Sequence, residues 1–190
     1  TRFYGTPPAE QFRIVIGFVN GPSCYGPSRQ LVGQSKEVFS IIGYAANRKG
    51  QPVLMADLGT VVHEFNHSFI KIEGDTKNAL AKSGKNIKSY SAFCMKQQAY
   101  DSWQTILEES LVRAAEKCYF IEHGDGKVDK GIRNEMNHGF FWMPELVQTL
   151  RYYESHRKKY PTFTSFYPEI IRFFDRYVTN MEKEMKKAMK

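Results

Sequence analysis

The run Val62-His63-Glu64-Phe65-Asn66-His67 constrains this chain more than any other segment. His63 and His67 are four positions apart, so on an α-helix their side chains project from one face, about one turn apart. Two imidazoles in this arrangement can bind a single metal ion, and zinc is the usual choice. Glu64 would lie beside the metal, where it can act as the general base that takes a proton from a zinc-bound water.

The residues around this run favour a helix with one buried side. Apolar residues recur at helical spacing, and they are Leu58, Val61, Val62, Phe65, Phe69 and Ile70. We expect Asp57 or Thr60 to cap the start of the helix and Gly74 to end it. Because short motifs also occur by chance, the competing interpretation is a helix with two ordinary histidines and a solvated Glu64.

A third ligand is expected further along the chain, because a catalytic zinc ion usually takes three protein ligands and leaves its fourth position to water. A second helical pattern, over Trp103 to Ala115, carries Glu108 and Glu109 in a largely apolar setting. Either carboxylate is a candidate. Periodicity alone does not choose between them.

Two segments give the chain a family resemblance. His-Glu-Phe-Asn-His-Ser-Phe at 63–69, paired with Glu-Glu-Ser-Leu-Val-Arg-Ala at 108–114, resembles a bacterial family of uncharacterised domains. The resemblance extends from about Phe3 to Tyr177 and includes the Asn-Gly-Pro-Ser-Cys-Tyr-Gly-Pro-Ser segment at 20–28. That family is itself similar to the gluzincins, which are zinc peptidases with a second-helix glutamate as the third ligand.

The resemblance implies a zincin-like fold and a complete ligand set for Zn²⁺. By alignment with the family pattern, the ligands are His63, His67 and Glu109, with Glu108 as the second choice. One position departs from the thermolysin-like branch, which has an aspartate where this chain has Arg113. We expect Arg113 to hydrogen-bond Glu109 across one helical turn or to face a substrate.

Hydrolysis at such a site also needs a hydrogen-bond donor for the developing oxyanion. The candidates are Tyr152, Tyr153, His138, His156 and Arg113. Tyr153 is preferred, because its Tyr-Tyr-Glu motif is part of the resemblance. The competing interpretation is a tyrosine packed in the core.

The pattern along the chain predicts an α+β fold in one domain over 1–190, sheet-rich at 1–55 and helical at 56–190. Strands are expected at 12–19, 37–45 and 52–54, in a small and mainly antiparallel sheet. Residues 38–45 are either the edge that binds an extended peptide or a plain internal strand, and the sequence does not choose between the two. From Lys71 the chain is rich in Lys, Ser, Gly and Asn, which suggests a flexible flap before a helix begins near Ala92.

Composition limits the partners and the location. No stretch approaches about eighteen consecutive apolar residues, so no transmembrane segment is expected. The net charge is +7, but acidic residues are interspersed, so a solvated surface is favoured over nucleic-acid binding. The chain lacks a starting Met and a charged-then-apolar leader. Together with the resemblance, this favours a periplasmic or extracellular location after removal of a signal.

The sequence therefore predicts a zinc metallopeptidase that hydrolyses peptide or protein substrates, with Glu64 as the general base. One alternative is a zinc-binding or protein-interaction domain whose catalysis has lapsed. Another is an interaction module without metal that uses the basic helical surface. Zinc content separates this last hypothesis from the other two, and the effect of Glu64→Gln on turnover separates the first two.

Overall fold

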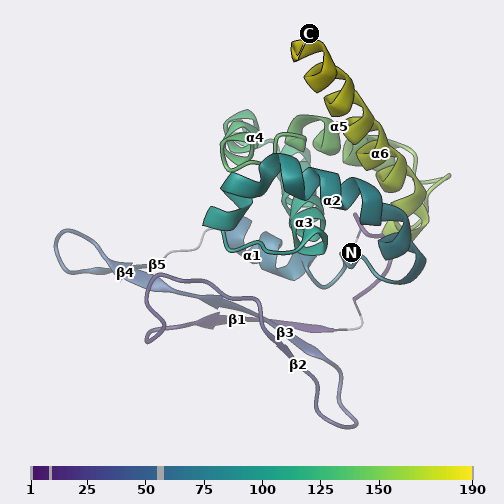
Figure 1. Cartoon of the computed structure of the whole chain (residues 1–190). Helices are drawn as coiled ribbons and strands as arrows, with labels where there is room; N and C mark the ends of the chain where they lie inside the picture. Colours follow the sequence, from purple (N-terminus) through teal and green to yellow (C-terminus); the bar gives the residue numbers. More distant parts are fainter. Residues whose placement is uncertain (1, 9, 55–57, 190) are drawn as a thin grey trace. The chain divides into compact units, whose positions relative to one another are not determined.

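The structure, a computed structural model, describes residues 2–8, 10–54 and 58–189. The chain forms two compact units, one over Thr6–Lys71 and the other over Arg2–Gly5 with Ile72–Lys190. The first contains the strands and one helix, and the second contains the remaining helices (Figure 1). An α+β fold with a small N-terminal sheet and a helical C-terminal part is thus confirmed, while the single-domain description stays a prediction.

The first unit is built on a three-stranded sheet in the order β1-β3-β2. Strand β1 (Gln11–Ile16) pairs with β3 (Glu37–Ile42) in parallel, from Gln11 opposite Glu37 to Ile16 opposite Ile42. Strand β2 (Ser28–Arg29) pairs with the other side of β3 in the antiparallel direction. Strands β4 (Tyr44–Ala46) and β5 (Pro52–Leu54) form a separate antiparallel hairpin.

The expected antiparallel pairing is wrong for β1 and β3, and of the two interpretations of residues 38–45 the internal strand is the one observed for 37–42. The longest ladder is parallel, because the chain leaves β1, returns along β2 on the far side of β3, and only then enters β3. For the same reason residues 37–42 form the central strand, and the edges of the sheet belong to β1 and β2. The two-residue β2 lies in a Gly/Pro-rich segment without an alternating pattern, so no periodic signal marks it.

Helix α1 (Leu58–Asn66) packs against β3 in the same unit. The ring of Phe65 lies 4.6 Å from that of Phe12 on β1, centroid to centroid, which anchors one side of the helix to the sheet. The expected helix boundaries need correction, because Thr60 lies inside the helix and Gly74 begins the next one. Asp57, the other expected cap, lies outside the described residues.

The second unit consists of five helices over the part of it that the structure describes. They are α2 (Gly74–Gln97), α3 (Trp103–Glu122), α4 (Val128–Asn137), α5 (Met143–Ser155) and α6 (Phe163–Ala188). Helix α3 contacts α2, α4 and α5, and α2 also contacts α6. The close approach of α2 to α3 uses Gly84, where a Cβ atom would lie 2.4 Å from the Trp103 ring.

The core of this unit is made of large apolar side chains from four helices and one loop. The fully buried ones include Leu80, Ile87, Met95, Ile106, Leu107, Leu111, Phe140, Trp142, Leu150, Phe166 and Phe174. Leu80 and Ile87 lie in the segment expected to be a flap, and their burial explains why α2 is one continuous helix from Gly74. None of the described helices is long and apolar enough to cross a membrane.

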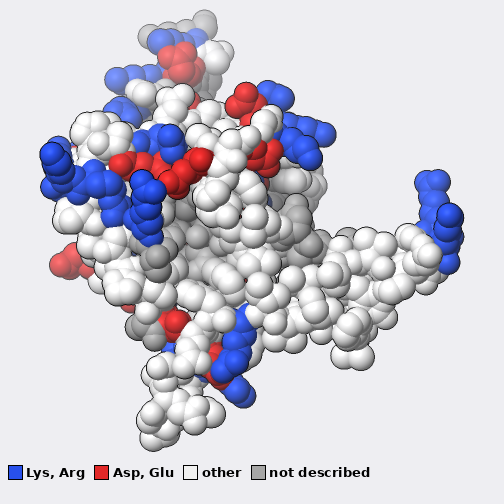
Figure 2. Space-filling model, turned by 180° about the vertical axis from the view of Figure 1, so that it is seen from behind, with Lys and Arg blue, Asp and Glu red and all other residues white. Residues whose placement is uncertain are grey.

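Charged side chains are mixed over the face of the molecule drawn in Figure 2. Blue and red side chains lie among one another over the bulky part of this face, whereas the tip of the protruding segment carries blue side chains only, and the coloured residues form no single basic stripe. Such mixing is the ordinary pattern of a solvated surface, because neighbouring opposite charges lower the repulsion that a net charge of +7 would otherwise create.

Candidate metal centre

The two motif histidines come from α1 and from the turn that follows it. His63 lies inside the helix, and His67 is the first residue after its end at Asn66. The backbone N–H of Ser68 donates to Phe65 O at 3.1 Å, so the turn still carries His67 round to the side of His63. The ring centroids are 5.1 Å apart with the planes at 77°, and both imidazoles are half-buried.

The two candidate glutamates on α3 have different surroundings. The carboxylate of Glu108 accepts hydrogen bonds from the backbone N–H of Ile72 at 2.8 Å and from Gln104 Nε2 at 3.2 Å. It is therefore engaged by the chain that leads into α2. Glu109 is turned away by one position and is only 9% exposed. Adjacent residues on a helix point in different directions, so the two carboxylates contact different parts of the protein.

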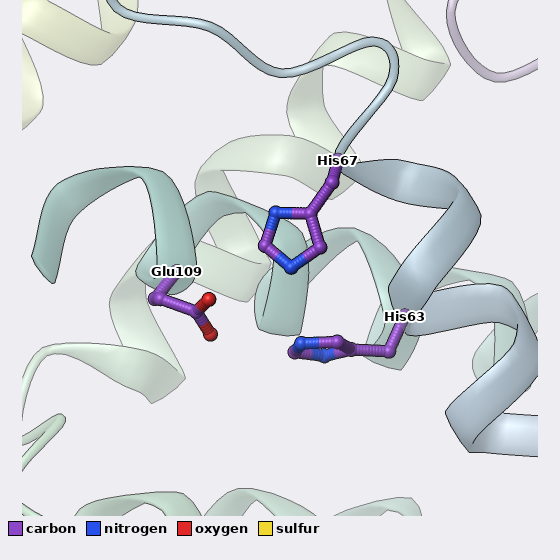
Figure 3. Close-up of side chains that lie close together, drawn as sticks. All are labelled: His63, His67 and Glu109. Carbon is purple, nitrogen blue, oxygen red and sulfur yellow. The ribbon is translucent and has the colours of Figure 1, made fainter. Parts of the chain in front are cut away.

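Glu109 is the glutamate that joins the histidines. Figure 3 shows the side chains of His63, His67 and Glu109 turned toward one another, and one ligand atom from each lies within 4.8 Å of the others. Two imidazole nitrogens and a carboxylate oxygen are a zinc-type donor set.

Arg113 connects Glu109 to a buried group of charges. Its Nε lies 3.5 Å from Glu109 Oε2, one helical turn away, which is an ion pair. Its Nη1 donates to Glu135 Oε2 on α4 at 2.7 Å, and Lys117 Nζ lies 3.3 Å from Glu135 Oε1. Burial lowers the pKa of Arg113, but Glu135, Tyr100 and Glu109 together outweigh it, so the net pKa is raised. The guanidinium thus stays charged behind Glu109.

Tyr100 is a neighbour of Glu109 that the sequence did not indicate. Its hydroxyl accepts a hydrogen bond from Arg113 Nη2 at 3.1 Å. Burial, followed by the charge of Glu109, raises the pKa of the phenol, so it keeps its proton at neutral pH. The preceding residue, Ala99, has φ of 59°, a left-handed conformation that is uncommon for alanine. The strained conformation of Ala99 places Tyr100 against α3.

Tyr153, the predicted oxyanion donor, lies in the aromatic core of the second unit. Its side chain is fully buried, with ring centroids of Phe3 and Phe166 at 5.5 and 5.0 Å. The guanidinium of Arg157 covers the ring at 4.4 Å. These contacts are those of a packed tyrosine, and the catalytic role stays a prediction.

The remaining donor candidates occupy exposed positions. Tyr152 and His156 stack on each other at 3.8 Å between ring centroids on the surface of α5. His138 follows the end of α4, where its carbonyl accepts a hydrogen bond from Gln98 Nε2 at 2.7 Å. Among the five candidates, Arg113 is the one for which the structure gives a direct contact to Glu109.

Glu64, the predicted general base, lies on α1 one position after His63 and is half-buried. Its carboxylate packs against Gly26, in the loop that precedes β2. Sequence analysis assigned no role to this glycine. The sign that could have drawn attention to it is the Tyr-Gly-Pro run inside the segment at 20–28, which is part of the family resemblance.

The chain belongs to the family described as a domain of unknown function (DUF4932), which matches residues 1–173. This match covers both histidines, Glu64 and Glu109, and it ends within α6. The predicted membership of a family of uncharacterised domains is thereby confirmed. No curated protein and no solved structure matches the chain.

Proposed function

We propose that this protein is a zinc-dependent peptide hydrolase of the gluzincin type, with a zincin-like fold. The observation that carries the proposal is the meeting of His63, His67 and Glu109, whose ligand atoms lie within 4.8 Å of one another. A zinc ion bound by these residues would polarise the scissile carbonyl and lower the pKa of the attacking water.

Glu64 supplies the proton transfers in this proposal. As a half-buried carboxylate one position after His63, it takes a proton from the attacking water. It then delivers that proton to the amine that leaves as the peptide bond breaks. Arg113, ion-paired to Glu109, holds the third ligand in its charged form, as second-layer partners do in metal sites.

Tyr100 is the better placed phenol for stabilising the oxyanion. The Tyr100 hydroxyl is hydrogen-bonded to Arg113 and lies near Glu109, whereas Tyr153 is fully buried among aromatic rings. A donor must reach the oxygen that gains charge, which a hydroxyl enclosed in the core does not do without rearrangement. The burial of Tyr153 also favours the second candidate function, a zinc-binding domain whose catalysis has lapsed.

The substrate in this proposal is an extended peptide or a flexible stretch of a protein. The central position of β3 moves the expected peptide-binding edge to β1 or to the segment that leads through β2. Strand β1 exposes Ile14 to 57% and Ile16 to 39%, so its surface is suited to apolar side chains.

The first test is elemental analysis of metal-stripped protein reconstituted with zinc. We expect about one zinc per chain in the wild type and in Glu108→Ala, and a much weaker affinity in Glu109→Ala. Glu108→Ala is the matched control, because it removes the adjacent carboxylate from the same helix. Equal zinc content in Glu109→Ala and wild type would overturn the ligand assignment.

The second test is hydrolysis of fluorescently labelled casein and of a quenched peptide library. We expect Glu64→Gln to keep its zinc and to lose about 10²–10⁴-fold in kcat, since it loses the general base. Tyr100→Phe is expected to lower kcat more than Tyr153→Phe does. A zinc-loaded wild type that cleaves nothing would instead favour the lapsed-catalysis alternative.

A further inference from the structure

The Glu64 carboxylate lies against a position that has no side chain, Gly26. A Cβ atom placed on Gly26 would lie 2.1 Å from Glu64 Oε2 and 3.2 Å from Glu64 Cδ. The first distance is shorter than a real Cβ atom tolerates, and the second is tighter than most real Cβ contacts. The carboxylate therefore occupies the space that any other amino acid at this position would fill.

The loop around Gly26 is fixed on both sides. The backbone N–H of Tyr25 donates to Ile41 O at 3.0 Å, and the N–H of Ile41 donates back to Tyr25 O at 2.8 Å. On the other side, the N–H of Phe39 donates to Pro27 O at 2.9 Å. Since β3 holds the residues before and after Gly26, the loop has little freedom to retreat from a side chain on α1.

The backbone conformation does not require a glycine here. Gly21 and Gly33 have φ of 64° and 75°, which is the left-handed region that glycine favours, but Gly26 is not among the residues with positive φ. An alanine would fit the backbone at this position. What a glycine provides at position 26 is room for the Glu64 carboxylate.

We propose that Gly26 is a positioning residue that fixes the Glu64 carboxylate for proton transfer, and this rests on the proposed function. The flat surface of the glycine backbone lets Oε2 lie against the loop and thereby selects the side-chain rotamer of Glu64. A β-carbon at position 26 pushes the carboxylate to another rotamer, while leaving His63 and His67 in place. The candidate metal ligands then keep their positions, whereas the Glu64 carboxylate is displaced from the position needed for proton transfer.

The matched pair of variants is Gly26→Ala and Gly126→Ala. Gly126 has no atom within 4 Å of an added Cβ and no positive φ, so its substitution controls for the change of a loop glycine. We expect both variants to bind zinc as the wild type does. Gly26→Ala should lower kcat about 10²-fold at similar KM, because most of the contribution of a general base is lost. Gly126→Ala should retain full activity.

A double-mutant cycle with Glu64 distinguishes positioning from general disruption. Added to Glu64→Gln, which lacks a base, Gly26→Ala should cause no further loss of residual hydrolysis. A further loss of similar size in this background would mean that the loop matters for a reason other than Glu64, and would overturn the proposal. Wild-type kcat in Gly26→Ala would overturn it as well.

A double-mutant cycle measured by Tm tests the contact between Gly26 and Glu64 without an activity assay. It also applies if a variant folds poorly. Glu64→Ala removes Oε2 and Cδ, while the remaining Cβ would lie 3.5 Å from the new atom, an ordinary contact. Because the displaced atom is the far end of a flexible side chain, we expect Gly26→Ala to lower Tm by only about 2 °C in the wild type and to leave it unchanged in Glu64→Ala. Equal decreases in both backgrounds would overturn the contact. If the zinc-loaded wild type is inactive yet this coupling is present, the hydrolase proposal fails while the steric role of Gly26 stands.

Discussion

The helices that carry the candidate ligands differ in how firmly their own units hold them. Helix α1 has nine residues, of which Gly59 and Asn66 are buried, and it depends on Phe65 for its anchorage to the sheet. Helix α3 has twenty residues, of which ten are buried. The histidines are thus presented by a short, half-exposed element, and the glutamate by the centre of a helical core.

This difference indicates where rigidity in the site originates. A carboxylate is a ligand with several possible orientations, and here its helix, its ion pair and its burial all restrict it. A pair of histidines at helical spacing needs less support, because the backbone turn already sets their separation. We therefore expect changes on α3 to affect stability strongly and changes on α1 to affect it weakly.

The largest effect is expected from Arg113→Ala. Removing the guanidinium leaves Glu135, which is 7% exposed, without its shortest ion pair, and breaking a buried pair in this way costs about 3–5 kcal/mol. Urea unfolding followed by circular dichroism measures the change. Arg113→Lys is the control, because it keeps the charge and loses the fork of donors. A cost below about 1 kcal/mol would show that Lys117 alone suffices for Glu135.

A smaller effect on stability is expected from a leucine-to-alanine substitution. Making this substitution once on α3 and once on α1 compares the two helices directly. Leu111 on α3 is fully buried, and Leu111→Ala is expected to destabilise the protein by about 2–5 kcal/mol through loss of packing. Leu58 on α1 is 55% exposed, so Leu58→Ala should cost less than about 1 kcal/mol. Similar losses in the two variants, measured by urea unfolding, would remove the contrast between the helices.

The smallest expected effect is the loss of sheet stability when Glu37 is protonated at acidic pH. Hydrogen bonds from Arg29 on β2 and from Arg13 on β1 lower the pKa of Glu37 on β3. Because the folded pKa lies below the unfolded value of about 4.3, ionised Glu37 stabilises the sheet above that pH. The contribution is lost as the pH falls through the folded pKa.

Hydrogen exchange of the β3 amides measures this contribution. Wild type should be better protected than Glu37→Gln at neutral pH, and the difference should disappear in acid once Glu37 is protonated in the folded state. A difference that is the same at both pH values would mean that the arginines act on β3 through packing and not through the charge of Glu37.

Much of the candidate site could be predicted because its spacing is local. The four-residue separation of His63 and His67 and the one-turn distance from Glu109 to Arg113 are properties of any helix. The choice of Glu109 over Glu108 came from the family pattern, because periodicity offers no criterion between adjacent residues. The surroundings that separate them, above all the hydrogen bond from Ile72 to Glu108, depend on tertiary structure.

What the sequence did not predict depends on contacts between distant segments. The parallel pairing of β1 with β3 follows from the path of the connection, which leaves no periodic signal. The continuous helix α2 overrides a polar composition because Leu80 and Ile87 are buried by neighbouring helices. Tyr100 and Gly26 have ordinary sequence surroundings, and their relation to Glu109 and Glu64 exists only in three dimensions.

Ser110, the residue after Glu109, is hydrogen-bonded to a tryptophan whose fluorescence can be measured. The indole Nε1 of Trp142 donates a hydrogen bond to Ser110 Oγ at 2.9 Å, and that hydroxyl donates in turn to Ile106 O at 2.6 Å. Trp142 is one of two tryptophans in the chain and is 1% exposed. Its fluorescence therefore originates beside the helical turn that presents Glu109, and the protein carries an intrinsic reporter of that turn without any added label.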